Sequence, residues 1–238
     1  MTLSVVIPTW NEASSISVAV SKALAINRVT QVIVSDGGSV DETCALAYAA
    51  GARVMSGARG RGSQLRLGAA ACAGEVIVLL HADTWLHPAA GDAIERAFRP
   101  SGVKRPVVAG AFTKRFRDAP SIMRGARWRS WLFFQFTGYA FGDQAIFVRR
   151  EVLEQIGGVP PVPLMEEFEL FRRLRSVGRM VLLQPSVTTS ARRFRQHGIV
   201  KTYGRMMRVL WLYRRGVSPD ELAKIYDGRG SKQGDLQP

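Results

Sequence analysis

The sequence predicts an α/β protein with a mostly parallel central sheet flanked by helices. Strand-like runs rich in Val and Ile alternate with helical segments along the first third of the chain, which is typical of βαβ units. Residues 75–84 contain five consecutive apolar residues without polar alternation, as a strand buried on both faces of a parallel sheet would. Polar residues follow three of these runs directly. In open α/β sheets, ligands bind at the edge formed by the carboxyl ends of the strands, and these polar residues are expected to lie there.

The first part of the chain supplies four strands and three helices. Pro8 stops the first strand, and a glycine closes both the second and the third helix. Ser39 and Glu42 have the spacing of a capping box for the second helix. The expected strands are 3–7, 31–35, 53–55 and the run that leads to Asp83, and the expected helices are 14–26, an Ala-rich segment ending at Gly51, and 63–73.

The second part of the chain is expected to continue the sheet and then become helical. Residues 107–112 and 144–148 have the composition of further strands. The basic, aromatic segment between them is expected to form a lid or an acceptor platform. Helices are expected at 166–177 and at 198–215, the latter with an amphipathic pattern. A last short helix begins after Ser218, which has the capping residue, the proline and the acid of a helix start.

Composition is that of a globular protein, with 47% hydrophobic and 22% charged residues. No basic region precedes Pro8, so no signal peptide is expected. The longest uncharged stretch, residues 130–142, is too short to span a bilayer. Cys44 and Cys72 lie in Ala-rich surroundings and are expected to be small core residues rather than a disulfide or a metal pair. We therefore expect a cytoplasmic protein.

Positive charge is concentrated in two stretches of the chain. Lys and Arg number 33 against 19 acids, a net charge of +14, and residues 114–129 and 192–215 carry almost all of the excess. Aromatic residues are interleaved with these bases, a mixture that suits an anionic membrane surface and predicts peripheral binding to the inner face of the membrane. Nucleic acid is a weaker candidate because no helix-turn-helix, RNP or zinc-finger motif is present. A solvated basic face without a partner is the remaining alternative.

Three polar clusters at strand ends predict a nucleotide site. They begin at Pro8, Asp36 and Asp83. The carboxylate of Asp36 can accept the imide N–H of a uracil, and the glycines beside it let the backbone approach a base or ribose. Asp83 is placed to hold a hard cation against a phosphorylated ligand, although an acid here could also cap the helix that follows. The Gly-rich loop 57–62 adds two arginines, or is a plain surface turn.

Six segments stand out by their order and spacing: SVVIPTWNE, VIVSDGGSVDET, GRGSQLRLGAA, VIVLLHADT, GDQAIFVRREVLEQIGG and MEEFELFRRLRSVG. Taken together they resemble those of family 2 glycosyltransferases of the GT-A fold over residues 3–184. This resemblance implies an inverting enzyme that transfers a sugar from a nucleotide diphosphate sugar, with UDP as the expected nucleotide, to an acceptor that the sequence does not identify. It implies Mg²⁺ or Mn²⁺ on Asp83 and a general base in the pair Glu166-Glu167. The implied nucleotide-binding residues are Pro8, Thr9, Glu12, Asp36, Gly37, Arg61, His81 and Ala82.

Two positions depart from the pattern of that family. The D-x-D element reads His81-Ala82-Asp83, so only its second acid remains; His81 either contacts the nucleotide or ends a buried strand. The E-D pair reads Glu166-Glu167, so the expected base, Glu167, is one methylene longer. Acids at the start of a helix also complement its dipole, which is the alternative interpretation of these glutamates.

Further residues are expected near the donor sugar and the acceptor. Asp143 is predicted to bind a sugar hydroxyl or merely to begin a strand, with Gln144 beside it. Arg192 and Arg193 are predicted to bind the diphosphate. His197 is either an additional metal ligand or a structural histidine.

Two other functions stay open from the sequence: a metal-dependent nucleotidyltransferase acting on sugar phosphates, and a non-enzymatic basic protein that binds membrane or nucleic acid. Under the preferred interpretation the GT-A domain spans residues 1–190, with its nucleotide-binding part at about 1–85 and its acceptor part at about 105–190. A helical extension follows at 191–226. Residues 227–238 are Gly-rich and polar and are expected to form a flexible tail.

Overall fold

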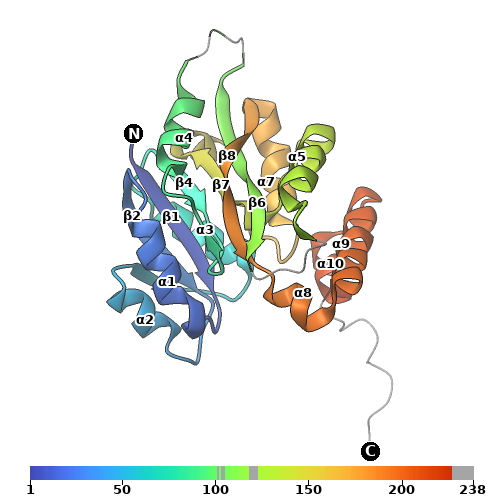
Figure 1. The fold of residues 1–238 in the computed structure, drawn as a ribbon, viewed down its shortest axis with the longest axis horizontal. Coiled ribbons are helices and arrows are strands. Elements are labelled where there is room, and N and C mark those ends of the chain that lie inside the picture. Colours follow the sequence, from blue (N-terminus) through green and yellow to red (C-terminus); the bar gives the residue numbers. More distant parts are fainter. Residues whose placement is uncertain (101, 103–104, 118–122, 227–238) are drawn as a thin grey trace, which may run out of the picture.

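The computed structural model describes residues 1–100, 102, 105–117 and 123–226. Strands and helices alternate through the first half, and the last third is mostly helical (Figure 1). The strands are β1 (Leu3–Thr9), β2 (Val29–Asp36), β3 (Arg53–Ser56), β4 (Val76–Leu79), β5 (Thr84–Trp85), β6 (Val107–Arg117), β7 (Ile146–Arg149) and β8 (Arg179–Ser190). The helices are α1 (Ala13–Leu24), α2 (Thr43–Ala49), α3 (Arg61–Ala70), α4 (Ala90–Phe98), α5 (Ala126–Thr137), the 3₁₀ turn η2 (Gly142–Gln144), α6 (Arg150–Gln155), α7 (Glu166–Val177), α8 (Arg192–His197), α9 (Ile199–Arg214) and α10 (Pro219–Tyr226).

One mixed sheet forms the centre of the molecule, with the strand order β3-β2-β1-β4-β7-β6-β8-β5. The four strands β1 to β4 pair in parallel, as do β6 and β8. Strand β7 runs antiparallel to both β4 and β6, and β5 runs antiparallel to β8. Because β6 and β8 point the same way as β1 to β4, the carboxyl ends of all six strands lie at one edge of the sheet. We call this the carboxyl edge.

Helices cover both faces of the sheet, which confirms the predicted α/β class. One core cluster joins α1, α2 and α4 to the sheet, for example through Ile16 and Ile94. The cluster on the other face joins α3, α6 and α7, for example through Leu65 and Phe171. Strand residues alternate between these clusters, as period-2 side-chain geometry requires, so consecutive residues such as Val5 and Val6 of β1 are both buried and apolar.

The C-terminal helices pack against the sheet domain through a third cluster. Met165 and Phe168, at the start of α7, belong to one buried cluster with Val209 and Leu210 of α9 and Leu222 of α10. The start of α10 has the predicted capping box: the hydroxyl of Ser218 accepts a hydrogen bond from the Glu221 N–H, and the Glu221 carboxylate accepts one from the Ser218 N–H. No helix in the described ranges is long and apolar enough to cross a membrane.

Some predicted elements are confirmed and others are wrong. Helix α7 spans the predicted residues 166–177. The predicted capping box of the second helix is wrong, because the Ser39 hydroxyl bonds to Asp36 and α2 has no side-chain cap. The strand predicted to lead to Asp83 ends at Leu79, four residues earlier, and β5 follows the intervening turn. Asp83 is therefore not the cap of α4, which begins at Ala90.

Strand β8 is one of two long elements that sequence patterns do not indicate, the other being helix α5. Pro185 lies in its middle, and a proline ordinarily argues against a central strand. The register between β6 and β8 shifts between Phe112 and Lys114, opposite this proline. An irregularity of this kind accommodates a residue that has no N–H to donate. The two cysteines are free; Cys72 lies in a core cluster as predicted, whereas Cys44 is only half-buried.

Candidate active site

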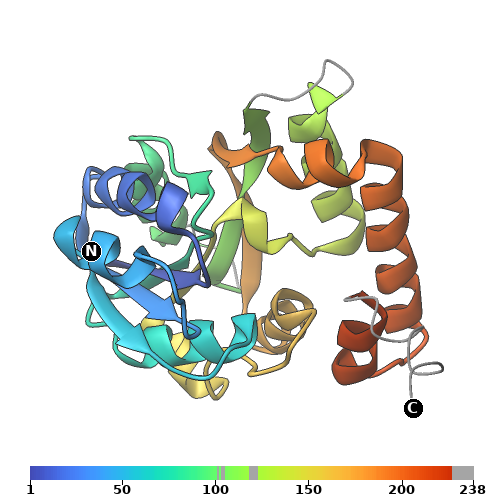
Figure 2. The same ribbon diagram turned by 90° about the horizontal axis from the view of Figure 1, so that it is seen from below.

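The polar strand ends converge as predicted. Thr9 is the register partner of Asp36, and Asp36 is the partner of Ser56, so the ends of β1, β2 and β3 are level at the carboxyl edge. The end of β8, the turn η2 before β7 and the first turn of α7 lie near the same edge, because η2 and α7 line one pocket there and Ser190 bonds to the turn after β4. Figure 2 looks onto this edge from below.

Asp36 organises the loop that follows β2. Its carboxylate is 1% exposed and accepts four hydrogen bonds, two from the N–H groups of Gly38 and Ser39 and two from the hydroxyls of Thr9 and Ser39. Burial alone would raise the pKa of Asp36, but the hydrogen bonds from Ser39, Thr9 and Gly38 outweigh it and lower the pKa. The carboxylate is thus ionised and fully engaged by the protein. A contact with a nucleotide base requires one of these bonds to be exchanged.

Gln64 is a site-forming residue that the sequence did not reveal. Its buried amide donates to the carbonyls of Thr9 (2.6 Å) and Ser35 (2.9 Å) and accepts from the N–H of Gly60. It therefore ties the ends of β1 and β2 to the start of α3. A Cβ atom on Gly37 would lie 3.0 Å from this amide, which explains the small residue there. A glutamine in a helix gives no local signal of such a role.

Backbone strain is also concentrated here. In the described residues, four non-glycine residues have a positive φ, and three of them lie at the carboxyl edge: Asn11, Ala145 and Met165. Asn11 joins two loops, since its N–H donates to the Ser39 hydroxyl and its side-chain oxygen accepts from Val40. Such conformations persist where the surroundings hold them and cluster at functional sites.

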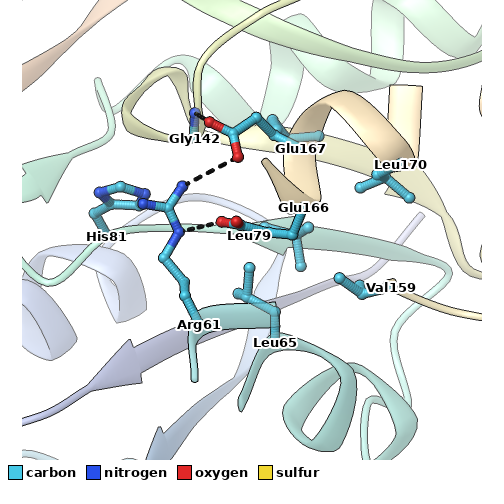
Figure 3. A pocket seen from close by; sticks show the side chains of 10 residues that line it. Arg61, Leu65, Leu79, His81, Gly142, Val159, Glu166, Glu167 and Leu170 are labelled. Carbon is cyan, nitrogen blue, oxygen red and sulfur yellow. Dashed lines mark hydrogen bonds and ion pairs between the residues drawn. The ribbon is translucent and has the colours of Figure 1, made fainter. Parts of the chain in front are cut away.

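Arg61 meets the two predicted catalytic glutamates (Figure 3). Its Nε forms an ion pair with Glu166, and its Nη2 lies 3.6 Å from Glu167. Both carboxylates are largely buried, at 4% and 12% side-chain exposure. Burial opposes the charge of the guanidinium, but the negative charges of Glu166 and Glu167 raise the pKa of Arg61. This placement differs from the sequence expectation, in which Arg61 faces the nucleotide.

One arginine cannot neutralise two carboxylates. Burial raises the pKa of Glu167 to about 7, the negative charge of Glu166 adds to the rise, and the charge of Arg61 partly opposes it. Glu167 also accepts a 3.4 Å hydrogen bond from the N–H of Gly142. A carboxyl group with a pKa near neutrality can both take and release a proton under ordinary conditions, as acid–base catalysis requires.

Gly142 allows this cluster to close. A Cβ atom there would lie 2.1 Å from the Arg61 guanidinium and 2.7 Å from Nε2 of His81. Arg61, His81, Gly142, Glu166 and Glu167 line one small pocket with a volume of about 10 Å³, comparable to a single water. The structure thus brings His81 to the glutamates. The predicted strand end is wrong, since β4 stops at Leu79.

Asp83 lies in the turn before β5, half-buried, and Ala82 beside it is buried. The backbone carbonyl of Asp83 accepts bonds from the N–H of Ser190 (3.2 Å) and from Arg117 (3.4 Å), so the ends of β6 and β8 are beside it. The stacking of the Arg117 guanidinium on Trp85, 3.6 Å from the ring centroid, fixes this corner.

Glu12 and Arg192, predicted separately as ligand contacts, pair with each other at 3.0 Å. Pro8 is half-buried in β1 nearby. The side chain of Arg193 lies outside the described part of the chain, although its backbone belongs to α8. His197 is exposed at the end of α8.

The described residues contain no group of three His, Cys, Asp or Glu that could hold a metal ion by themselves.

Asp143 and Gln144 have different roles from each other. The carboxylate of Asp143 receives two hydrogen bonds from Lys114 Nζ, at 2.6 and 2.7 Å, and remains partly exposed. Gln144 is fully buried: its amide donates to the Phe112 carbonyl and accepts from the Phe141 N–H. The prediction that Gln144 contacts the donor or acceptor is therefore wrong, because its polar atoms hold η2 in place. The sequence did not indicate that Lys114 pairs with Asp143, because Lys114 is one base among many in its stretch.

The fold is that of a GT-A glycosyltransferase: helices on both faces of a mixed sheet, and polar loops gathered at its carboxyl edge. The chain belongs to glycosyl transferase family 2, whose family model matches residues 4–154. It is therefore a glycosyltransferase, as the resemblance implied. No curated protein matches the chain in sequence.

Several solved structures share this fold. Glucosyl-3-phosphoglycerate synthase from Mycobacterium tuberculosis, in complex with Mn²⁺, UDP and glucosyl-3-phosphoglycerate, is 22% identical over 79% of this chain and 70% of its own, with a TM-score of 0.55. The mannosyltransferase PcManGT from Pyrobaculum calidifontis, in complex with GDP-Man and Mn²⁺, is 18% identical over 98% of this chain and 76% of its own, with a TM-score of 0.61. TarS from S. aureus, in complex with UDP, is 13% identical over 80% of this chain and 60% of its own, with a TM-score of 0.60. The chain thus spans less than two thirds of the TarS structure.

Proposed function

We propose that this chain transfers a sugar from a UDP-sugar to an acceptor hydroxyl with inversion, by a single displacement in which Glu167 is the general base. The observation that carries the proposal is the position of Glu167: largely buried, in the first turn of α7, at the edge where the strand-end loops converge. The same observation supports Glu166 as the neighbouring acid that tunes the base.

The displacement needs few protein groups. The acceptor oxygen bonds to the anomeric carbon as the bond from that carbon to the diphosphate oxygen breaks, and the hydroxyl proton passes to Glu167. Attack opposite the leaving group inverts the anomeric configuration. Arg61 keeps Glu166 paired, so that Glu167 is the carboxylate available to take the proton.

The strand-end loops would hold the nucleotide. Thr9, Asp36 and Gly37 shape the loop for the base, and Pro8 and Glu12 line the end of β1. Similar structures support UDP, since two of the three structures described above hold it and the third holds GDP-Man.

One protein carboxylate is enough for a metal ion whose other ligands include the phosphates of the bound nucleotide. Mg²⁺ is commonly bound by one or two carboxylates together with the phosphates of the substrate, so the lack of a three-residue group in the described chain is compatible with such a site. Asp83 would hold the ion, with His197 as a further candidate. When bound, the cation neutralises charge on the diphosphate. Arg192, Arg193 and Asp143 are the proposed contacts to the diphosphate and sugar.

We propose a peripheral position on the inner face of the membrane, with a lipid-linked acceptor. The bases and aromatic residues of α5, α8 and α9 support this placement.

Thermal shift and donor turnover test the proposal. UDP-sugars with Mn²⁺ should raise the unfolding temperature more than GDP- or dTDP-sugars. Asp83→Asn should remove the metal-dependent part of that shift and the turnover, while Asp220→Asn, an exposed acid on α10, should change neither. Metal-dependent turnover retained by Asp83→Asn would contradict the assignment. Release of pyrophosphate from a nucleoside triphosphate would instead indicate nucleotidyl transfer.

A further inference from the structure

Two helices turn apolar side chains toward solvent. Within the described residues, thirteen large hydrophobic residues are exposed, and α5 and α9 supply seven of them. Isolated exposed apolar residues are ordinary, but a concentration of this kind marks an interaction surface. We call these residues, with the bases between them, the α5–α9 surface. Its apolar members are Trp128, Trp131, Leu132 and Phe136 on α5 and Val200, Met207 and Trp211 on α9.

The opposite faces of both helices are already used for packing. Helix α5 buries Ser130 and Phe134 on the sheet side, and α9 buries Val209 and Leu210. Phe133 packs with the α9 residues in one cluster, so the two helices are neighbours. Both lie on the side of the molecule away from β3 and α2 (Figures 1 and 2). The exposed stripes on α5 and α9 therefore face away from the sheet.

The charge of this surface has one sign. No acid occurs in residues 123–142 or 191–219. The Arg215 guanidinium lies 4.1 Å from the Trp211 ring centroid, so bases and aromatic rings are in contact. The exposed bases are Arg124, Arg127, Arg129, Lys201, Arg205, Arg208, Arg214 and Arg215.

We propose that the α5–α9 surface binds the headgroup region of an anionic lipid bilayer. Exposed Trp with Arg and Lys is the combination that lies in the membrane interface, where rings enter the headgroup boundary and cations meet phosphates. The aliphatic members, such as Leu132 and Val200, favour lipid over nucleic acid, since they gain free energy by leaving water but offer nothing to a phosphate backbone.

This surface is continuous with the candidate site. Helix α9 follows α8 directly, and α8 begins at Arg192, which pairs with Glu12. Ser190, just before it, bonds to the backbone of Asp83. A bilayer bound at α9 therefore brings headgroups close to the carboxyl edge. The choice of acceptor, a hydroxyl carried by a membrane lipid, rests on the proposed function; the bilayer contact itself does not.

Co-sedimentation of the full chain with vesicles tests the contact. Vesicles of phosphatidylcholine with phosphatidylserine should bind the protein, and phosphatidylcholine alone should bind it less. The triple variant Trp128→Ser/Trp131→Ser/Trp211→Ser should lose at least about tenfold in vesicle affinity. Each of Arg127→Gln, Lys201→Gln and Arg208→Gln should lose about fivefold and weaken the salt dependence. Phe136→Ser, whose side chain is 85% exposed, tests the apolar contact without disturbing the core.

Matched changes elsewhere serve as controls. Tyr48→Ser on α2, Arg53→Gln on β3 and Arg96→Gln on α4 also remove exposed rings or bases, and they should leave vesicle binding unchanged. The proposal is overturned if the surface variants bind as the parent does, if the parent binds neither vesicle, or if duplex DNA or RNA displaces it from anionic vesicles at equal phosphate. Vesicle binding without donor turnover would refute the proposed function and leave the surface assignment intact.

Discussion

At the scale of single residues, the decisive feature is that Glu166 and Glu167 share one arginine. Glu166 has the closer ion pair, which leaves Glu167 as the carboxylate whose protonation changes near pH 7. The sequence placed both glutamates through the family resemblance. Their pairing with Arg61 could not be predicted, because it joins the starts of two helices that are remote in sequence and no local pattern encodes it.

Glu167→Gln should lower sugar transfer by roughly 10²- to 10⁴-fold, because the amide keeps the size of the side chain but cannot take the proton. Donor binding, measured by thermal shift, should persist. Full transfer activity in this variant would mean that the base lies elsewhere, and Asp143 would be the next carboxylate to test.

Glu166→Gln should shift the pH profile of transfer toward acid. The parent should gain activity as the pH rises through about 7, where Glu167 ionises. Since the negative charge of Glu166 helps to raise the pKa of Glu167, its removal should lower that pKa. The pH dependence of kcat/KM measures the shift, with Glu151→Gln, which changes an exposed acid of α6, as the control. An unmoved or alkaline-shifted profile would contradict the coupling.

Glu167→Gln should also change stability in a pH-dependent way. The pKa of Glu167 is raised on folding, so its contribution to stability is complete below its ordinary value of 4.5 and is lost as the pH rises through about 7. The variant should therefore unfold at a higher temperature than the parent at pH 8 and at a similar temperature at pH 4. Melting curves of variant and parent at the two pH values measure this. The same difference in unfolding temperature at pH 4 and pH 8 would show that Glu167 does not titrate with a raised pKa.

At the scale of elements, α7 is held from outside the sheet domain. The hydroxyl of Tyr213 on α9 donates to Glu169 (2.6 Å), and its ring meets Phe168 edge-on. Sequence patterns predicted the bounds of α7 and the start of α10, because caps and apolar periods are local. They did not predict β8, whose proline is tolerated only opposite an irregularity in β6, nor α5, whose apolar residues face outward.

Tyr213→Phe should destabilise the protein by about 1 kcal/mol, the usual net contribution of one hydrogen bond. Glu169 keeps Arg172 as a partner at 2.8 Å, so the loss should stay modest. Chemical denaturation measures the change, with Tyr48→Phe as a control because that ring is exposed. A loss of transfer beyond the loss of stability would show that this bond also positions the first turn of α7.

At the scale of the whole molecule, the predicted boundary at residue 190 is not a boundary in packing. Helices α9 and α10 cover Met165 and Phe168, which adjoin the two glutamates. The division into a 1–190 domain and a 191–226 extension remains a prediction about folding, and the shared cluster argues against it. The predicted tail, 227–238, lies outside the described residues.

A chain ending at Ser190 should be less stable than the full chain by about 3 to 6 kcal/mol, if Met165 and Phe168 each lose the burial of one large apolar side chain. Urea denaturation and binding of a hydrophobic dye measure the effect. A chain ending at Tyr226 is the control and should unfold like the parent. Cooperative, parent-like unfolding of the shorter chain would establish residues 1–190 as an independent domain.

The order of strands in the sheet determines when each strand can pair during synthesis on the ribosome. Strands β1 to β4 emerge first and can pair at once. The second edge of β4 pairs with β7, and β5 pairs only with β8; β7 and β8 emerge much later. At about 5–20 residues per second, the exposed flank of β4 waits for several seconds. The ion pair between Glu12 and Arg192 forms later still. The nascent chain therefore presents an apolar strand with one unpaired edge to chaperones well before the carboxyl edge is complete enough to bind a donor.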